Sequence, residues 1–445
     1  MPTLKPTRLT IRSYQVGFGD CYLLTFRYPG GGGQSDDRHV LVDCGSTGKP
    51  KHGLALKDVA ARIASDCGGK LTAVIATHRH ADHINGFATS KNGKGAGDIL
   101  RALNPKLVLQ PWTEDPKAAR NAKAPPLSAH GGPPAFQPRH FVAALNQMHT
   151  VAGLVLEELK RFGSGLSART RSQLRFLGEE NLANLSAVKN LMSMGGKAEY
   201  LHYGKPTALS KELPGVKIHV LGPPTPAQYP DIEKQRSRDA AEFWHILGAA
   251  ARRLTAAGGL APFHRAFAHR PAPGAGARFP HSARWIIGRV RAAHVSQRLE
   301  IVRALDDAMN NTSLILLFEV GGKKFLFPGD AQIENWNYAL KDAPNAAANR
   351  ALLAGTDFYK VGHHGSLNAT PKTLWNLFKK KGVSTKPGRL STAVSTMAGK
   401  HGNDRNDTEV PRTTLVKALT SESAFFTTQA LRKKADVSKA MEFNL

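Results

Sequence analysis

The stretch of sequence that decides the fold is Thr77-His78-Arg79-His80-Ala81-Asp82-His83, which places three imidazoles and one carboxylate close together. An apolar, partly β-branched run at residues 71–76 precedes it and predicts a buried strand. Because side chains alternate at a strand end, the first two histidines point the same way, while the aspartate and the third histidine lie on the following turn. Borderline-soft divalent metals prefer such a mixture of nitrogen and oxygen ligands. The stretch therefore predicts a metal site at the end of a strand.

Length and composition limit the class of protein. The 445 residues can bury one large core or two ordinary ones, and 41% hydrophobic residues indicate a globular chain. No apolar stretch approaches the length that crosses a bilayer, and the first eight residues lack the apolar segment of a signal peptide, so no membrane partner is expected. Three scattered cysteines imply no disulfide framework and fit a reducing, cytoplasmic location.

The net charge of +27, from 61 Lys and Arg against 34 Asp and Glu, indicates the chemistry of a partner. Such a field attracts polyanions and raises their local concentration, so a nucleic acid is the expected partner. Solubility alone is the other explanation of the charge.

An arginine-rich segment is a second sign of phosphate binding. Residues 252–303 contain ten arginines and no lysine, and arginine binds phosphate in a bidentate fork. We expect substrate contacts from Arg252, Arg253, Arg284 and Arg289 of this segment, together with Lys400. An ordinary solvated helical surface explains the segment equally well.

Further polar groups follow later strands. Asp330 lies where an extended run meets a glycine turn, so its carboxylate can bridge two cations, although it can also cap a helix that begins at Ala331. His363 and His364 follow another strand, and neighbouring side chains there point to opposite sides, so one ligates metal while the other faces the substrate. The residue types do not decide which is which. His401, in a glycine loop, completes the metal set, binds phosphate beside Lys400, or is simply exposed.

Together these motifs resemble the metallo-β-lactamase superfamily, and within it the ComEC-like hydrolases. The resemblance rests on residues 16–20 (VGFGD), 41–45 (LVDCG), 78–83 (HRHADH), 311–314 (NTSL), 327–330 (FPGD) and 360–366 (KVGHHGS). It implies an α/β fold, the αββα metallo-β-lactamase-like sandwich, interrupted here by helical and arginine-rich insertions. The expected segments are an N-terminal half over 1–137, a helical insertion over 138–214, a core strand at 215–224, an arginine-rich insertion or lid over 225–309 and a C-terminal half over 310–445.

The resemblance also implies a site for two divalent metal ions. The expected metal ligands are His78, His80, Asp82, His83, Asp330, His363, His364 and His401, and the expected catalytic residues are Asp82, Lys360, His363 and His364. Zn²⁺ is favoured by the histidines, and Mn²⁺ by the carboxylate oxygens. An additional histidine ligand that many relatives place between His83 and Asp330 has no obvious counterpart; His130, His140 and His149 are weak candidates, and water is the alternative.

These inferences predict a metal-dependent hydrolase of phosphodiester bonds, and more narrowly a nuclease on DNA or RNA. The first alternative is a small-molecule hydrolase of the same fold, acting on a phosphocholine-type ester, a lactone or, less in keeping with a cytoplasmic protein, a β-lactam. The second is a binding module whose metal is only structural. A structural zinc site is closed and four-coordinate, whereas this chain offers six or more ligands, which favours catalysis.

Overall fold

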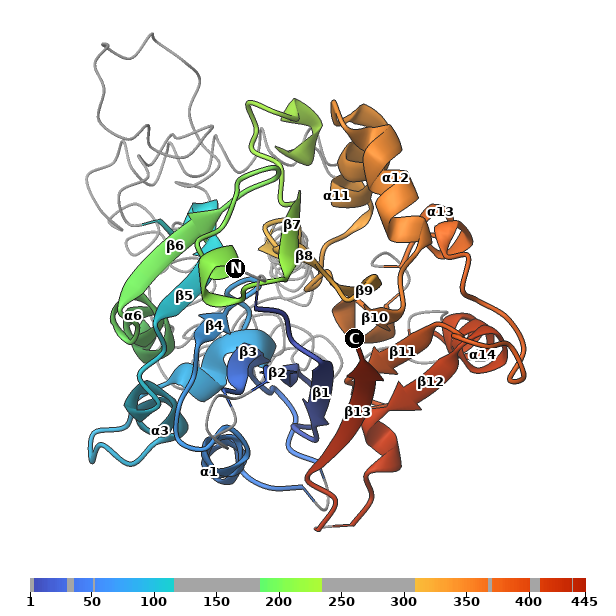
Figure 1. Cartoon of the computed structure of the whole chain (residues 1–445). Helices are drawn as coiled ribbons and strands as arrows, with labels where there is room; N and C mark the ends of the chain where they lie inside the picture. Colours follow the sequence, from blue (N-terminus) through green and yellow to red (C-terminus); the bar gives the residue numbers. More distant parts are fainter. Residues whose placement is uncertain are drawn as a thin grey trace, which may run out of the picture.

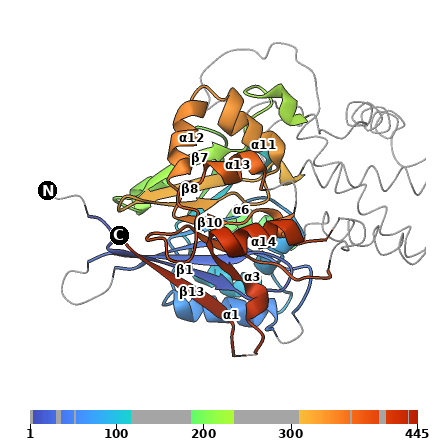
Figure 2. The ribbon, with the colours of Figure 1, turned by 90° about the vertical axis from the view of Figure 1, so that its right-hand side faces the viewer.

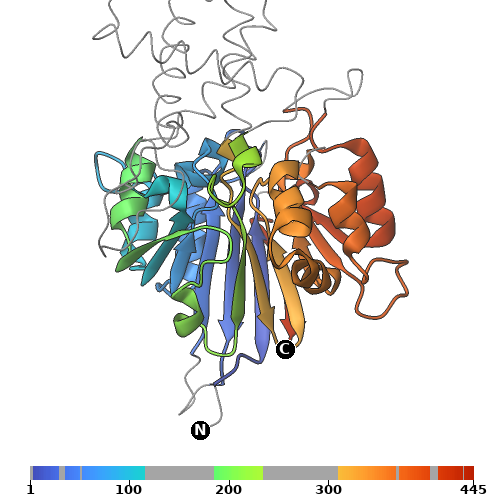
Figure 3. The same ribbon diagram turned by 90° about the horizontal axis from the view of Figure 1, so that it is seen from above.

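The computed structural model describes residues 4–29, 36–50, 53–115, 185–233, 309–366, 370–400, 409–433 and 435–445. These residues form two β-sheets that pack face to face, with helices on both outer faces (Figure 1). A view turned by 90° shows the layers: α12 and α13 lie on one side, α1 and α3 on the other, and the sheets between them (Figure 2). The arrangement confirms the predicted αββα sandwich, which Figure 3 shows from above.

The first sheet has the strand order β13-β1-β2-β3-β4-β5-β6 within the described residues. Its four strands from β13 to β3 are antiparallel, and those from β3 to β6 are parallel. The strands are β1 (Arg8–Tyr14), β2 (Cys21–Arg27), β3 (Arg38–Cys44), β4 (Ala73–Ile75), β5 (Leu107–Pro111), β6 (Lys197–Leu201) and β13 (Ser438–Asn444).

The second sheet has the order β12-β11-β10-β9-β8-β7 in the described part of the chain. Strands β9 to β12 are parallel, while β8 is antiparallel to both of its neighbours. A two-residue turn at Gly321 and Gly322 joins β8 to β9, and both glycines have positive φ angles, as a tight hairpin requires. The strands are β7 (Lys217–Gly222), β8 (Ile315–Val320), β9 (Lys323–Phe327), β10 (Phe358–Lys360), β11 (Ser391–Val394) and β12 (Ala424–Thr427).

Three apolar layers hold the sandwich together. Between the sheets, aromatic side chains such as Phe318, Phe327 and Phe358 are fully buried. The outer face of the first sheet is covered by α1 (Leu56–Asp66), α3 (Ala96–Ala102) and α6 (Leu185–Ser193). The outer face of the second sheet is covered by α11 (Ile333–Asn337), α12 (Ala346–Ala354), α13 (Lys372–Leu377) and α14 (Thr413–Glu422). Burial of both faces of each sheet explains why the central strands read as continuous apolar runs.

Two strands of the first sheet are not evident from the apolar pattern of the sequence. The last strand, β13, follows β12 and pairs with β1 along its whole length. The range predicted as a helical insertion, 138–214, contains β6, which adds an edge to the first sheet beside β5. Both are edge strands with many polar residues and weak alternation, so they lack the apolar signal of a central strand. Among the helices of the described residues, none combines the length and apolar character needed to cross a membrane.

Candidate metal centre

The candidate site lies where parallel strands of both sheets end, and glycines let its loops approach closely. The Asp20 N–H donates to the Asp82 carbonyl over 3.0 Å, which joins the loop after β1 to the helix α2 (Ala81–Ile84). A Cβ on Gly45 would stand 2.3 Å from the Asp82 carbonyl carbon, so only glycine permits this approach. Crevices at the carboxyl ends of parallel strands are the usual place for a ligand in such sheets.

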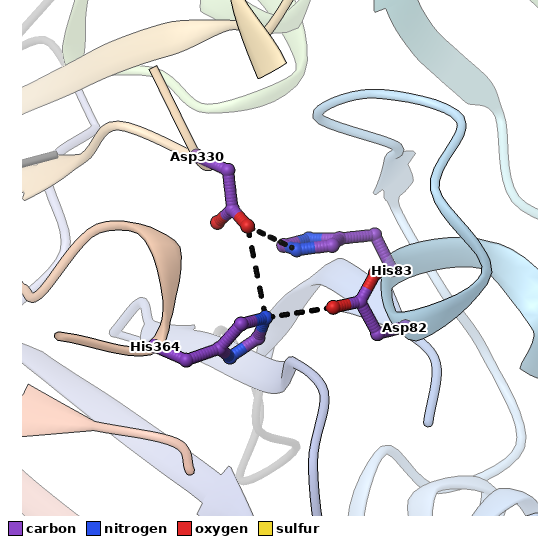
Figure 4. A group of neighbouring side chains, drawn as sticks. All are labelled: Asp82, His83, Asp330 and His364. Carbon is purple, nitrogen blue, oxygen red and sulfur yellow. Dashed lines mark hydrogen bonds and ion pairs between the residues drawn. The ribbon is translucent and has the colours of Figure 1, made fainter. Parts of the chain in front are cut away.

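Four side chains form the centre of the site: Asp82, His83, Asp330 and His364, all buried (Figure 4). Their ligand atoms lie within 4.8 Å of one another. His364 Nε2 is 2.9 Å from Asp82 Oδ2 and 3.6 Å from Asp330 Oδ2, and His83 Nε2 is 3.1 Å from Asp330 Oδ2. The structure thus brings together residues that are separated by almost three hundred positions in the sequence.

These residues fit a divalent cation. In a tetrahedral site with bonds of about 2.1 Å, neighbouring ligand atoms stand about 3.4 Å apart, which is close to the three distances between the side chains. Asp82 Oδ1 is buried and has no hydrogen-bond partner among the described residues, an arrangement that is costly unless another group satisfies it. Two carboxylate and two imidazole ligands suit Zn²⁺, and the oxygens also suit Mn²⁺.

Neighbouring groups orient both imidazoles. The Nδ1 of His364 lies 2.8 Å from the carbonyl oxygen of Ser395, so Nδ1 carries the proton and Nε2 is left as the ligand atom. The Nδ1 of His83 lies 2.8 Å from Asp43 Oδ2, which fixes that ring in the same way. Asp43 in turn accepts hydrogen bonds of 2.7 Å from the N–H and the hydroxyl of Thr77. Asp43 was not among the residues predicted for the site, although its place near the end of β3, two residues before Gly45, was a usable signal.

His78 and His80 form a second group beside this centre. His78 Nε2 and His80 Nδ1 lie within hydrogen-bond distance, 2.9 Å apart, and neither histidine belongs to the ligand clusters that the described residues form, so their role as metal ligands stays a prediction. Burial lowers the pKa of both imidazoles, and the neighbouring histidine His83 lowers both further. They are therefore neutral at pH 7, which is the form that binds a metal.

The charges of the central cluster depend on one another. Burial alone would raise the pKa of Asp330, but His83, Lys360 and His364 outweigh it and hold that pKa well below its usual range. Conversely, burial would lower the pKa of His83, but the carboxylates of Asp330, Asp43 and Asp82 raise it well above its usual value. In the metal-free protein the imidazoles of this cluster thus carry protons that a cation must displace.

Lys360, predicted as a catalytic residue, is a buried counter-charge in the structure. Its ammonium contacts the carboxylate of Asp20, lies 3.4 Å from Asp330 Oδ1 and donates to the Gly329 carbonyl over 3.1 Å. Only 3% of Lys360 is exposed, and its ammonium offsets the negative charge of the Asp330 carboxylate. Its catalytic role stays a prediction. Asp20, which sequence reasoning missed, follows a glycine at the end of a loop much as Asp330 does.

The structure separates the two adjacent histidines whose roles the sequence left open. His364 points into the central cluster, whereas His363 lies half-buried and its Nδ1 is 2.8 Å from the hydroxyl of Ser366. His363 is absent from the ligand clusters formed by the described residues, and metal binding by His363 stays a prediction. Both histidines have positive φ angles, 43° and 52°, a strained conformation for non-glycine residues that is concentrated at functional sites.

Of the remaining predicted residues, the structure describes Lys400. It is exposed, in the loop after β11, and lies close to Gly48: a Cβ added to Gly48 would stand 3.4 Å from the Lys400 Cε. It therefore lies at the same end of the sandwich as the metal centre. Outside the described residues lie His130, His140, His149, Arg252, Arg253, Arg284, Arg289 and His401.

An αββα sandwich with a histidine and aspartate cluster at its strand ends defines a class of metallohydrolases. Residues 14–151 match the family model described as the metallo-beta-lactamase superfamily. The chain therefore carries a domain of the metallo-β-lactamase superfamily, as its motifs predicted. No curated protein matches the chain. The narrower ComEC-like assignment stays a prediction.

Proposed function

We propose that this protein is a metal-dependent phosphodiesterase, and specifically a nuclease that acts on DNA or RNA in the cytoplasm. The single observation that carries the hydrolytic part is the buried cluster of Asp82, His83, Asp330 and His364, with its unsatisfied Asp82 oxygen. The net charge of +27 supports a polyanionic substrate over a small neutral one.

The chain's own residues divide the work between binding metal and binding substrate. Asp82, His83, Asp330 and His364 would hold one divalent cation, and His78 with His80 would hold part of a second. Such cations, Zn²⁺ or Mn²⁺, supply Lewis acidity and a water molecule of lowered pKa.

Three residues outside the cluster have roles in this proposal. His363, half-buried beside the cluster, is the group available to move a proton or to bind a phosphoryl oxygen, and its bond to Ser366 orients the ring. Lys400, exposed at the same end, adds positive charge for a nucleic acid backbone. Lys360 positions Asp330 and does not touch the substrate.

The test uses the full chain, stripped with EDTA and reloaded with Mn²⁺ or Zn²⁺. We expect cleavage of bis-p-nitrophenyl phosphate and of at least one form among linear, circular and single-stranded DNA and RNA. His364→Ala should abolish the activity. The control variant His219→Ala removes a histidine on β7 that is paired with Glu319 on β8, and it should keep the activity. Absence of cleavage with either metal on every substrate would falsify the proposal.

Salt dependence separates a nuclease from a small-molecule hydrolase of the same fold. Nucleic acid binding should weaken by orders of magnitude between about 50 and 200 mM salt, because each phosphate contact releases counterions. Turnover of a neutral ester or lactone should hardly change over that range. A flat salt profile for DNA and RNA binding, with efficient lactone turnover, argues for the small-molecule alternative.

A further inference from the structure

We propose that a pocket at the edge of the sandwich binds an unpaired base of a single-stranded nucleic acid whose phosphate lies at the metal centre. The pocket is formed by the segments that follow β6 and β7 and by the π-helical turn η7 (Tyr338–Asp342). The inference rests on the proposed nuclease function and adds to it the form of the substrate, a single strand.

The pocket lies at the same end of the sandwich as the metal centre. In the first sheet, β6 is parallel to β4, which leads into the histidine motif, so residues 202–206 after β6 lie at that end. In the second sheet, β7 and β9 are both antiparallel to β8, so the segment after β7 lies at the same end as Asp330. The Leu314 N–H donates to the Thr77 carbonyl over 2.9 Å, which joins these ends of the two sheets.

In both sheets the pocket lies two strands away from the metal ligands. In the first sheet β5 separates β6 from β4, and in the second sheet β8 separates β7 from β9, which leads to Asp330. Neighbouring strands lie about 4.8 Å apart, so the pocket lies about 10 Å to the side of the metal ligands. At a rise of about 3.4 Å per nucleotide, this distance corresponds to about three nucleotides of a stacked strand. A base close to the phosphate at the metal centre can therefore reach the pocket.

The lining of the pocket suits a base better than a phosphate. The pocket has a volume of about 660 Å³, which is within the range of small-ligand sites. The rings of Tyr203 and Tyr338 meet edge to face, with centroids 4.9 Å apart, and form its aromatic wall. Unpaired bases stack on such rings and form hydrogen bonds through their edges. The polar residues of the lining are His202, Lys205, Gln228 and Asp342. They provide donors and acceptors for the edge of a base, but only one positive charge against one negative charge, so a phosphate is not favoured.

Contacts around the two tyrosines hold the aromatic wall in place. The Tyr203 N–H donates to the Pro223 carbonyl over 2.7 Å, and the Asn349 Nδ2 donates to the Tyr203 hydroxyl over 2.9 Å. The half-buried Tyr229 packs against Tyr338, with ring centroids 5.2 Å apart. Tyr338 lies in a π-helical turn, a rare conformation that is frequent at functional sites. Because the wall is already fixed, little side-chain entropy is lost when a base binds.

Positive charge next to the pocket can hold the backbone of the bound strand. Lys341 is exposed on the same π-helical turn as Tyr338. Contacts of lysine with phosphate position a strand without reading its sequence. The pocket, in contrast, requires a base that is not paired, because the bases of a duplex are stacked in its interior. The pocket should therefore add to the affinity for single strands and not to the affinity for duplexes.

The experiment measures binding of the full chain to fluorescent oligomers of DNA and RNA, as single strands and as matched duplexes, in EDTA so that no cleavage occurs. Tyr338→Leu removes the ring and should weaken single-strand binding about 5- to 150-fold, the contribution of one stacked base, while duplex binding stays unchanged. The control variant is Tyr28→Leu. Tyr28 is also buried but follows β2, which is antiparallel to β3 and so ends at the opposite end of the sandwich, and this variant should bind as the wild type does.

A second measurement uses the wild type alone and so does not depend on the folding of Tyr338→Leu. Single-stranded oligomers that carry one iodouracil are irradiated in complex with the protein, and the crosslinked residue is identified by mass spectrometry. Crosslinks to Tyr203, Tyr229 or Tyr338 support the assignment. Absence of crosslinks to all three tyrosines overturns it, as does a Tyr338→Leu variant that binds single strands normally or loses single-strand and duplex binding equally.

The outcomes separate this inference from the proposed function. A wild type that binds neither single strands nor duplexes, of DNA or of RNA, removes both. Cleavage of nucleic acid by the wild type, with normal single-strand binding by Tyr338→Leu, removes the base pocket alone. Crosslinks at these tyrosines and the expected loss of binding, without cleavage in either metal form, leave the pocket standing while the nuclease proposal fails.

Discussion

Replacing Lys360 with Met tests whether the buried ammonium is a counter-charge or a catalytic group. The substitution leaves the carboxylates of Asp20 and Asp330 buried without their shared cation. Breaking a buried ion pair by removing one partner costs about 3–5 kcal/mol. At about 2–4 °C per kcal/mol, the metal-free variant should unfold about 6–20 °C below the wild type. A divalent cation beside Asp330 supplies positive charge in place of the ammonium, so metal should raise the melting temperature of the variant more than that of the wild type.

The assay is thermal unfolding in EDTA and in saturating Mn²⁺, with Asp20→Asn and the double variant completing a cycle. Because Asp20 and Lys360 are in contact, the double variant should be more stable than the sum of the single effects predicts, by about 0.5–3 kcal/mol. If Lys360→Met keeps the stability and metal affinity of the wild type and loses only turnover, the counter-charge argument is refuted and Lys360 is catalytic after all.

Three further predictions follow from the same geometry. Metal uptake at pH 7 should release protons, and metal affinity should rise with pH, because nearby carboxylates raise the pKa of His83 and His364 in the metal-free protein despite their burial. Calorimetry in buffers of different ionisation enthalpy measures the proton release. Equal binding heats in all buffers contradict the prediction. Gly329→Ala should lower the free energy of unfolding by about 1–3 kcal/mol, because Gly329 has a φ of +55° and the new Cβ would meet the Thr77 side chain. Unfolding in urea measures this change. An unchanged unfolding midpoint counts against the prediction. Asp82→Ala should weaken binding of the first cation by at least about 10–100-fold, and retention of that cation after dialysis, measured by metal analysis, would remove Asp82 from the ligand set.

The sequence predicted the parts of the site whose chemistry is compact along the chain. Three imidazoles and a carboxylate within one short stretch have few structural explanations, so His78, His80, Asp82 and His83 were found together. The sandwich was predicted from the resemblance to the metallo-β-lactamase superfamily, and the apolar runs of its central strands agree with burial on both faces. Asp330 was found from its place between a strand and a glycine turn.

Other parts depend on contacts that no local pattern contains. The sequence does not show which charge Lys360 meets, because Asp20, which contacts its ammonium in the fold, is distant in the chain. The role of Asp43 is visible only once β3 and α2 are adjacent. A strained turn points the ring of His364, and not that of His363, into the cluster. Because both residues are histidines, the sequence alone does not show which of them points inward.

The wide separation of the cluster along the chain has a consequence during synthesis. His83 and His364 are 281 positions apart, and β9 and β10, which present Asp330 and His364, come late. A chain that has been synthesised only as far as β5 carries the histidine motif without Asp330 or His364. A cation held by all four side chains would therefore be bound only after β9 and β10 have been made and the two sheets have packed together.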